Sequence, residues 1–219
     1  MHENTAMRLI KQLQAFGSVP FTHGALLSYL GDYRRPNDKI ARLLAAADLV
    51  QLKKGLYVLG AEHRAAPVSL PLVANLLYGP SCVSLDFALS WHGLIPEGVF
   101  QLSSVTARRS RQYDTPVGVF SYAHIPAALY GIGVQMEQNP DGSCFLLAGA
   151  EKALCDKLLL TRNLSAYTAA AMRSFLLEDL RIDIEDLARL DLTPVRHYLA
   201  AGYKPRQLQA LCNLLESLQ

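Results

Sequence analysis

Apolar residues recur at helical spacing three times within the first 62 residues. The first pattern covers residues 4–16 and includes Met7. The second begins after Thr22, a suitable capping residue, and ends near Gly31. The third begins at Pro36 or Asn37, and its predicted buried stripe consists of Ile40, Leu43, Leu44 and Ala47. This spacing leaves Lys39 and Arg42 on the opposite, exposed side of the third helix.

A β-hairpin is predicted to follow these three helices. Two short apolar runs over residues 49–59 flank the turn Lys53-Lys54-Gly55. Three helices followed by a hairpin with a basic tip are typical of a winged helix-turn-helix. We therefore expect residues 1–62 to form such a module, with residues 61–67 as a linker ending in proline.

The middle of the chain, residues 63–162, mixes helical and strand patterns. Helices are predicted over residues 68–78, from the capping Ser84 to Gly93, and over 149–161. Strands are predicted over residues 99–105, 118–122 and, as a hairpin, 134–138 and 143–147.

Residues 163–219 have helical patterns alone, over 166–178 and 184–190, and again from Pro194 and Pro205. Ser165 is predicted to cap the first of these helices, and Leu208, Leu211, Cys212 and Leu215 are predicted to share one face of the last. The expected fold class is therefore α+β: an N-terminal winged helix-turn-helix, a mixed α+β domain and a helical C-terminal region.

Composition narrows the class of protein. Hydrophobic residues make up 51% of the 219 and charged residues 18%, which excludes a disordered chain. The apolar runs are too short to span a membrane, and the polar N-terminus is not a signal peptide. The four cysteines have no CxxC spacing, so we expect buried thiols in a reducing cytoplasm.

Positive charge is concentrated near the N-terminus. Residues 1–62 carry 8 Lys and Arg against 5 Asp and Glu, whereas residues 63–162 carry 7 against 7 and residues 163–219 carry 6 against 7. Cations on the exposed face of a third helix and on a hairpin tip suit the major groove and phosphate backbone of double-stranded DNA. The predicted DNA-binding residues are Arg34, Arg35, Asn37, Lys39, Arg42, Lys53 and Lys54. The alternatives are a solvated helix face and a protein-interaction module without DNA binding.

A second basic cluster follows the first predicted strand of the middle region. Thr106, Arg108, Arg109 and Arg111 stand within six residues. Arginine forks suit phosphate or carboxylate groups, so the cluster is a candidate contact for an anion or a charged partner. A solvated loop is the alternative interpretation.

Motifs for catalysis are scarce. The sequence has no GxxxxGK[ST], no GxGxxG after a strand and no GxSxG, and its six histidines form no metal-binding pattern. His92 is interpreted as a packing residue. Glu151, Lys152, Asp156 and Lys157 contain the groups of a nuclease site, but the predicted helix there disfavours one. We therefore expect no catalytic residues, cofactor or metal. A phosphate-ester or phosphotransfer enzyme using the 106–111 loop and Asp156 stays as an alternative.

Three segments taken together resemble a known family. They are GPSCVSLDFALSWHGLIP (79–96), SVT (104–106) with the arginines that follow, and GAEKALCDK (149–157). In this order they resemble the AbiEi-type antitoxins of bacterial abortive-infection, type IV toxin–antitoxin modules, also described as predicted transcriptional regulators of viral defence against phage. The resemblance implies a winged helix that represses its own promoter through inverted repeats, as two monomers or a homodimer on the DNA. It also implies a larger C-terminal part that neutralises a nucleotidyltransferase-like toxin.

Overall fold

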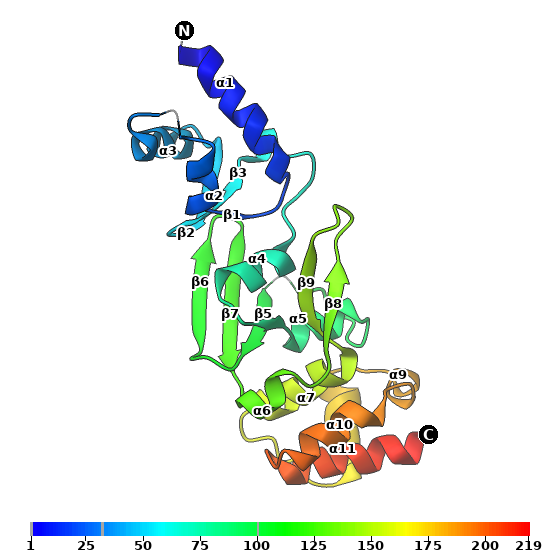
Figure 1. Ribbon diagram of the computed structural model, residues 1–219. Helices are drawn as coiled ribbons and strands as arrows, with labels where there is room; N and C mark the ends of the chain where they lie inside the picture. The colour runs from blue at the N-terminus through cyan, green and yellow to red at the C-terminus, as the bar shows by residue number, and fades with distance from the viewer. Residues whose placement is uncertain (1, 32, 100) are drawn as a thin grey trace.

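The computed structural model of the protein describes residues 2–31, 33–99 and 101–219. The molecule is elongated, with α1 (His2–Leu13) and α11 (Pro205–Leu218) at opposite ends (Figure 1). The described residues form a mixed α+β fold with eleven α-helices, a three-stranded antiparallel sheet, a six-stranded mixed sheet and a helical C-terminal end. This confirms the expected α+β class. None of the helices in these ranges has the length and apolar character that a membrane span requires.

The first 62 residues follow the predicted order of elements and add a short strand. After α1 come η1 (Gln14–Phe16), β1 (Phe21–Thr22), α2 (His23–Ser28), α3 (Pro36–Ala45), β2 (Leu49–Lys53) and β3 (Leu56–Leu59). Thr22 caps α2 as predicted, since its Oγ1 accepts a hydrogen bond from the Ala25 amide at 3.2 Å. The helix ends at Ser28, three residues before the predicted Gly31.

The three strands form one small sheet in the order β1-β3-β2, beside the three helices. Its hairpin turns at Lys54-Gly55, where the φ of +82° at Gly55 favours glycine. Ala47 was wrongly predicted to be buried: α3 ends at Ala45, and Ala47 has a φ of 59° and is exposed. The side chain of Met7 lies outside the described part of the chain.

A separate apolar core holds these elements together. Its buried residues are Leu9, Ile10, Leu13, Phe21, Leu26, Leu30, Ile40, Leu43, Leu49, Tyr57 and Leu59. The segment predicted as a linker is fixed to the same elements. Ser18 Oγ donates to the Ala66 carbonyl at 2.6 Å, and His63 Nε2 lies 2.7 Å from Asp48 Oδ1.

The middle of the chain contributes all six strands of the larger sheet and the helices between them. In chain order this part of the protein consists of η2 (Ala61–His63), α4 (Leu70–Leu77), β4 (Cys82–Val83), α5 (Leu85–Trp91), β5 (Leu102–Thr106), β6 (Arg111–Thr115), β7 (Gly118–His124), α6 (Ala127–Tyr130), β8 (Val134–Gln138), β9 (Cys144–Ala148) and α7 (Ala150–Leu160). The predicted helices and the 134–147 hairpin are confirmed. The strand predicted at 99–105 begins at Leu102, and Phe100 lies outside the described residues.

Two strands of this sheet were missed. The sheet order is β6-β7-β5-β4-β9-β8, so β4 lies at its centre and β6 at one edge. The pairs β5–β7 and β4–β9 are parallel, and the other neighbours are antiparallel. β4 has only two residues, too few for an alternating pattern, and β6 has no apolar alternation because it forms an edge with mostly polar side chains.

The C-terminal region packs against α7. It consists of α8 (Ala169–Ser174), the π-helix η3 (Phe175–Asp179), α9 (Ile184–Ala188), α10 (Leu192–Ala200) and α11. Thr168, not the predicted Ser165, caps α8 by accepting from the Ala171 amide at 3.2 Å. Pro205 begins α11 and the four residues predicted to share one of its faces are all buried, as expected.

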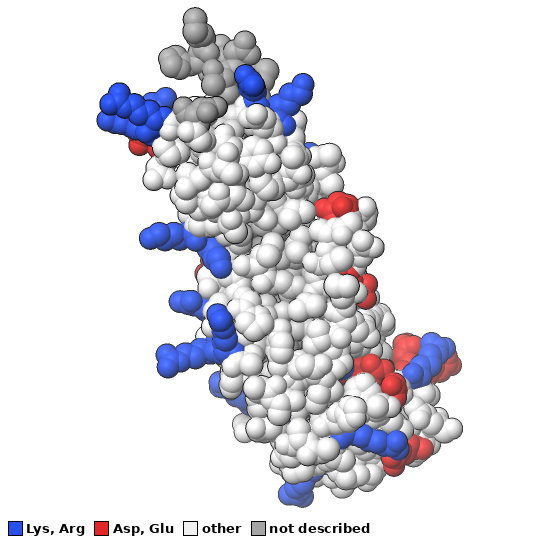
Figure 2. Space-filling model, in the orientation of Figure 1, with Lys and Arg blue, Asp and Glu red and all other residues white. Residues whose placement is uncertain are grey.

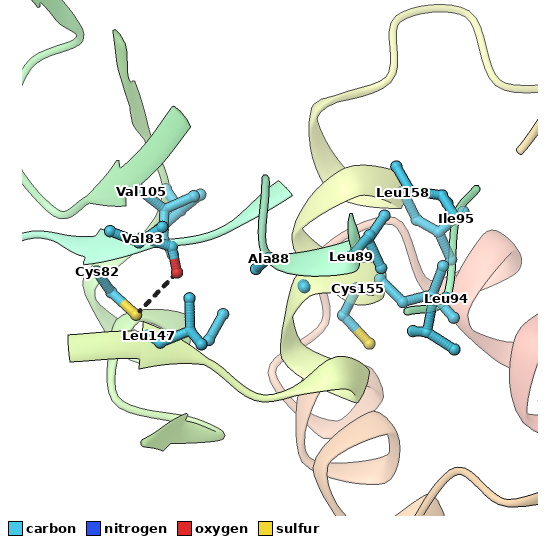
Figure 3. Packing of buried hydrophobic residues seen from close by; sticks show 14 of the residues in the cluster. Cys82, Val83, Ala88, Leu89, Leu94, Ile95, Val105, Leu147, Cys155 and Leu158 are labelled. Carbon is cyan, nitrogen blue, oxygen red and sulfur yellow. Dashed lines mark hydrogen bonds between the residues drawn. The ribbon is translucent and has the colours of Figure 1, made fainter. Parts of the chain in front are cut away.

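One large core joins the sheet to the C-terminal helices (Figure 3). Cys82, Val83 and Leu147 belong to the sheet side of this core, and Cys155 and Leu158 come from α7. Leu52, Leu56 and Val58 of the β2–β3 hairpin also contribute to it. Burial raises the pKa of the Cys82 thiol to about 12. Cys144 is an exception to the predicted burial of all four cysteines, because the edge of the β8–β9 hairpin exposes it.

Candidate nucleic-acid interface

The N-terminal end of α3 carries two adjacent arginines and an asparagine in exposed positions. Pro36 occupies the first turn of α3, where its fixed φ suits a helix start, and Arg34 and Arg35 immediately precede it. Arg34, Arg35 and Asn37 are exposed. The only partner of Arg35 among the described ion pairs is Asp38, at 3.7 Å, and both side chains are largely solvated. Such a pair contributes little stability and leaves the guanidinium available to a ligand.

Two further cations lie along α3. Ile40 and Leu43 are buried and fix the orientation of the helix, so Arg42 is exposed and Lys39 is half-buried. Neither cation forms an ion pair within the described ranges. The predicted division of α3 into a buried and an exposed face is confirmed at Ile40, Leu43 and Arg42, whereas Lys39 is half-buried instead of exposed.

The two lysines of the β2–β3 hairpin have different environments. Lys54 lies in the turn and is exposed. Lys53 is the last residue of β2, and its Nζ donates to the carbonyls of Leu76, at 3.4 Å, and Leu77. Burial lowers the pKa of Lys53, and the nearby Arg111 adds to the effect. Carbonyls at the C-terminus of a helix attract cations, so Lys53 joins the hairpin to α4.

Thr106 has a structural position rather than an exposed one. It is fully buried at the end of β5, where its Oγ1 donates to the Pro80 carbonyl at 2.7 Å and accepts from the Arg108 amide at 3.2 Å. Both bonds use the hydroxyl, so Thr106 shapes the β5–β6 loop. Arg108, Arg109 and Arg111 are exposed on that loop and on β6.

The basic residues of α3 and the β2–β3 hairpin and those of the β5–β6 loop and β6 lie along the same edge of the molecule. In the view of Figure 2, Lys and Arg side chains follow the edge formed by α3, the β2–β3 hairpin and β6, whereas Asp and Glu are more frequent on the opposite side and around the C-terminal helices. The nearly balanced charge of the whole chain therefore conceals an uneven distribution.

The residues considered for a nuclease site are dispersed or buried. Asp156 and Lys152 are fully buried, and their charged groups lie 3.3 Å apart. Lys157 pairs with Asp86 at 2.7 Å, and Glu151 Oε1 accepts from the Asp191 amide at 3.0 Å. Among the described residues no three His, Cys, Asp or Glu side chains are grouped to hold a metal ion.

The sequence did not indicate the network that surrounds Asp156. Its two carboxylate oxygens accept from Tyr198 Oη at 2.6 Å and Ser84 Oγ at 2.7 Å. Lys152 Nζ donates to Tyr198 Oη at 2.8 Å and to the Leu129 carbonyl at 3.3 Å. Burial raises the pKa of Asp156, although Lys152 and the hydroxyl donors oppose this effect. The predicted capping role of Ser84 was wrong in this respect, because its hydroxyl bonds Asp156 instead of the α5 amides.

His92 has the packing role that was expected. It is half-buried at the end of α5, and its Nε2 lies 2.8 Å from the Ala148 carbonyl at the end of β9. This bond joins α5 to the central sheet.

Neither a protein-family model nor a curated protein matches this chain.

Proposed function

We propose that this protein is a cytoplasmic DNA-binding transcriptional regulator whose first 62 residues form a winged helix-turn-helix. In this proposal α3 enters the major groove and Lys54 on the wing contacts the phosphate backbone. The observation that carries the proposal is the exposed basic face of α3 beside an exposed lysine at a two-residue hairpin turn. Arg34, Arg42 and Lys54 form no ion pair among the described residues, so each is available to contact the DNA.

The individual residues have different parts in this proposal. Arg34, Arg35, Lys39 and Lys54 neutralise phosphates, whereas Asn37 and Arg42 are the candidates for base edges. Lys53 is left out of the interface, because its ammonium is bonded to the end of α4. These hydrogen bonds hold the hairpin against α4 of the second region.

We further propose the antitoxin role that the resemblance to the AbiEi-type family implies. The regulator represses its own promoter through inverted repeats as a pair of subunits, and the region after residue 62 neutralises a nucleotidyltransferase-like toxin. The motifs that carry this resemblance lie in α5, at the end of β5 and in α7. The enzyme alternative has less support, since Thr106 and Asp156 are both fully buried.

Binding to the promoter DNA tests the regulator proposal. Fluorescence anisotropy with a duplex from upstream of the gene should give an affinity that falls with salt, because each neutralised phosphate contributes roughly 0.9 to the slope of log K against log salt. Lys54→Ala should weaken binding about tenfold and reduce that slope by about 1, because it removes a phosphate contact. Arg42→Ala should weaken binding to the promoter duplex by about tenfold and relax the sequence preference, because Arg42 is a candidate for a base edge.

The matched controls are Arg162→Ala and Arg173→Ala, exposed arginines outside the proposed interface. They should leave the affinity unchanged. If the wild-type protein does not bind the duplex at low salt, the module is a protein-interaction domain and the DNA proposal fails. Rescue of growth by the full-length protein carrying Arg42→Ala and Lys54→Ala, during co-expression with the product of the neighbouring gene, would separate the antitoxin role from DNA binding.

A further inference from the structure

An open pocket of about 590 Å³ lies between the end of α4 and the β5–β6 loop. It is lined by Tyr78, Ala107, Arg108, Arg109, Ser110 and His124. Its volume is within the range of small-molecule sites, roughly 300–1,000 Å³. The pocket belongs to the six-stranded sheet, and its arginines continue the basic edge that α3 and the β2–β3 hairpin begin (Figure 2).

The positive charge at this pocket is not neutralised within the described chain. Arg108, Arg109 and Arg111 take part in none of its ion pairs. The guanidiniums of Arg108 and Arg111 lie 6.0 and 5.8 Å from the centroid of the Tyr78 ring, which gathers them around one aromatic side chain. A cluster of cations without carboxylates favours an anionic ligand.

The loop that carries the arginines has a fixed shape despite its exposure. The carbonyls of Arg108 and Arg109 accept from His124 Nδ1 at 2.9 Å and Tyr78 Oη at 3.2 Å, and Ser110 Oγ accepts from the His124 amide at 2.9 Å. The buried Thr106 fixes the start of the loop through the Arg108 amide. The loop is therefore ordered before a ligand arrives, which lowers the entropy cost of binding.

His124 also presents a ring nitrogen to this region. A carbonyl oxygen only accepts, so the contact with Arg108 places the proton of the neutral imidazole on Nδ1. Nε2 has no protein partner among the described residues, and the side chain is exposed. It is therefore available to a polar group of a ligand, close to the two arginines of the loop.

We propose that this pocket binds a small phosphate-bearing ligand of about the size of a mononucleotide. Arg108 and Arg109 bind the phosphate, His124 contributes a hydrogen bond, and Tyr78 with Ala107 forms the apolar wall for the rest of the ligand. The apolar wall beside the arginines suits the base or another nonpolar part of a small molecule, which a contact to the sugar-phosphate backbone of a duplex would leave unused.

Isothermal titration calorimetry with three probes tests the proposal. Adenosine 5′-monophosphate and inorganic phosphate should bind the full-length protein, and adenosine should not, because it lacks the anion. Arg108→Ala combined with Arg109→Ala should weaken binding of the monophosphate by at least about tenfold, as expected for the loss of charge-assisted hydrogen bonds. Both residues are exposed, so the double variant should keep the wild-type circular dichroism and thermal midpoint.

The matched control combines Arg162→Ala with Arg173→Ala, which removes the same charge elsewhere on the surface. Monophosphate binding that survives in this control and is lost in the loop variant supports the pocket. The proposal is overturned if the wild-type protein binds neither phosphate probe at millimolar concentration, if adenosine binds as tightly, or if both double variants weaken binding equally. It is also overturned if the loop variant weakens duplex DNA binding while the wild type binds no monophosphate, since the arginines would then belong to a DNA surface.

Discussion

Charged side chains have opposite environments on α3 and on α7. Arg35 and Asp38 at the start of α3 form a pair at 3.7 Å with side chains that are 81% and 60% exposed. Lys152 and Asp156 of α7 form a pair at 3.3 Å with both side chains 0% exposed. Within each pair the two residues lie about one helical turn apart in sequence. The two pairs therefore look alike in the sequence, although one is solvated and the other is buried.

This difference separates the two uses of charge in the molecule. Water already solvates the cations around α3, so an added intramolecular partner contributes little and the charge is available to a ligand. The buried pair of α7 has lost its water, and its polar atoms depend on Ser84, Tyr198 and the Leu129 carbonyl. The exposed charges are therefore expected to govern binding, and the buried charges stability.

The largest expected effect comes from truncating the buried carboxylate. Asp156→Ala leaves the ammonium of Lys152 and the hydroxyls of Ser84 and Tyr198 without their acceptor inside the core. Removing one partner of a buried pair costs about 3–5 kcal/mol, so urea denaturation should show a loss of that size. Asp38→Ala, at the exposed pair, is the matched control and should change stability by less than about 0.5 kcal/mol. Equal effects of the two variants would contradict the comparison.

The raised pKa of Asp156 predicts a pH dependence. Asp156 ionises from pH about 3.8 in the unfolded chain and only at higher pH in the folded protein. The folded state therefore holds more protons in this window, and its stability relative to Asp156→Asn should fall as the pH rises through it. The decrease amounts to roughly 1.4 kcal/mol for each unit by which the pKa is raised. Urea titrations of both proteins between pH 3.5 and 7 measure this decrease. If the stability of the wild type relative to Asp156→Asn rises with pH instead, folding lowers the pKa of Asp156 and the prediction is wrong.

The sequence predicts the α3 side of this comparison better than the α7 side. The apolar spacing of Ile40 and Leu43 alone places Arg42 on the exposed face of α3, because a helix repeats every 3.6 residues. The network of Asp156 brings together residues that are 72 and 42 positions apart, and no local pattern specifies such contacts. The apolar residues around Lys152 and Asp156 were the available signal, but charges four residues apart are also typical of a solvated helix face.

The β2–β3 hairpin also has a long-range contact that its local sequence does not predict. The sequence predicts the hairpin, since glycine follows two lysines between apolar runs, but it places Lys53 in the turn, whereas Lys53 is the last residue of β2. It does not distinguish Lys53 from Lys54. Their difference arises from the position of α4, whose last carbonyls come within reach of Lys53 alone.

An intermediate loss of stability is expected at Lys53, whose side chain is neither solvated like those at the start of α3 nor fully buried like that of Lys152. Lys53→Met keeps the length of the side chain but removes its hydrogen bonds to the α4 carbonyls. We expect a loss of about 1–2 kcal/mol in urea denaturation, because charge-assisted bonds are partly solvated here. The salt slope of DNA binding should stay unchanged, whereas Lys54→Met should reduce the slope by about 1 and leave stability unaltered. If Lys53→Met lowers the slope instead, Lys53 contacts phosphate and its bonds to α4 are secondary.

The smallest expected effect is the coupling free energy between the exposed residues Arg35 and Asp38. A double-mutant cycle of Arg35→Ala and Asp38→Ala should give a coupling free energy of about 0.2–0.5 kcal/mol, since both side chains are solvated and the separation is 3.7 Å. The same variants should act in opposite directions on DNA binding. Arg35→Ala removes a cation from the proposed interface and weakens binding, whereas Asp38→Ala removes a nearby negative charge and strengthens it. Thermal denaturation and anisotropy on the same four proteins measure both quantities. A coupling above about 1 kcal/mol, with no change in affinity, would mean that Arg35 is held by Asp38 and serves the fold rather than a ligand.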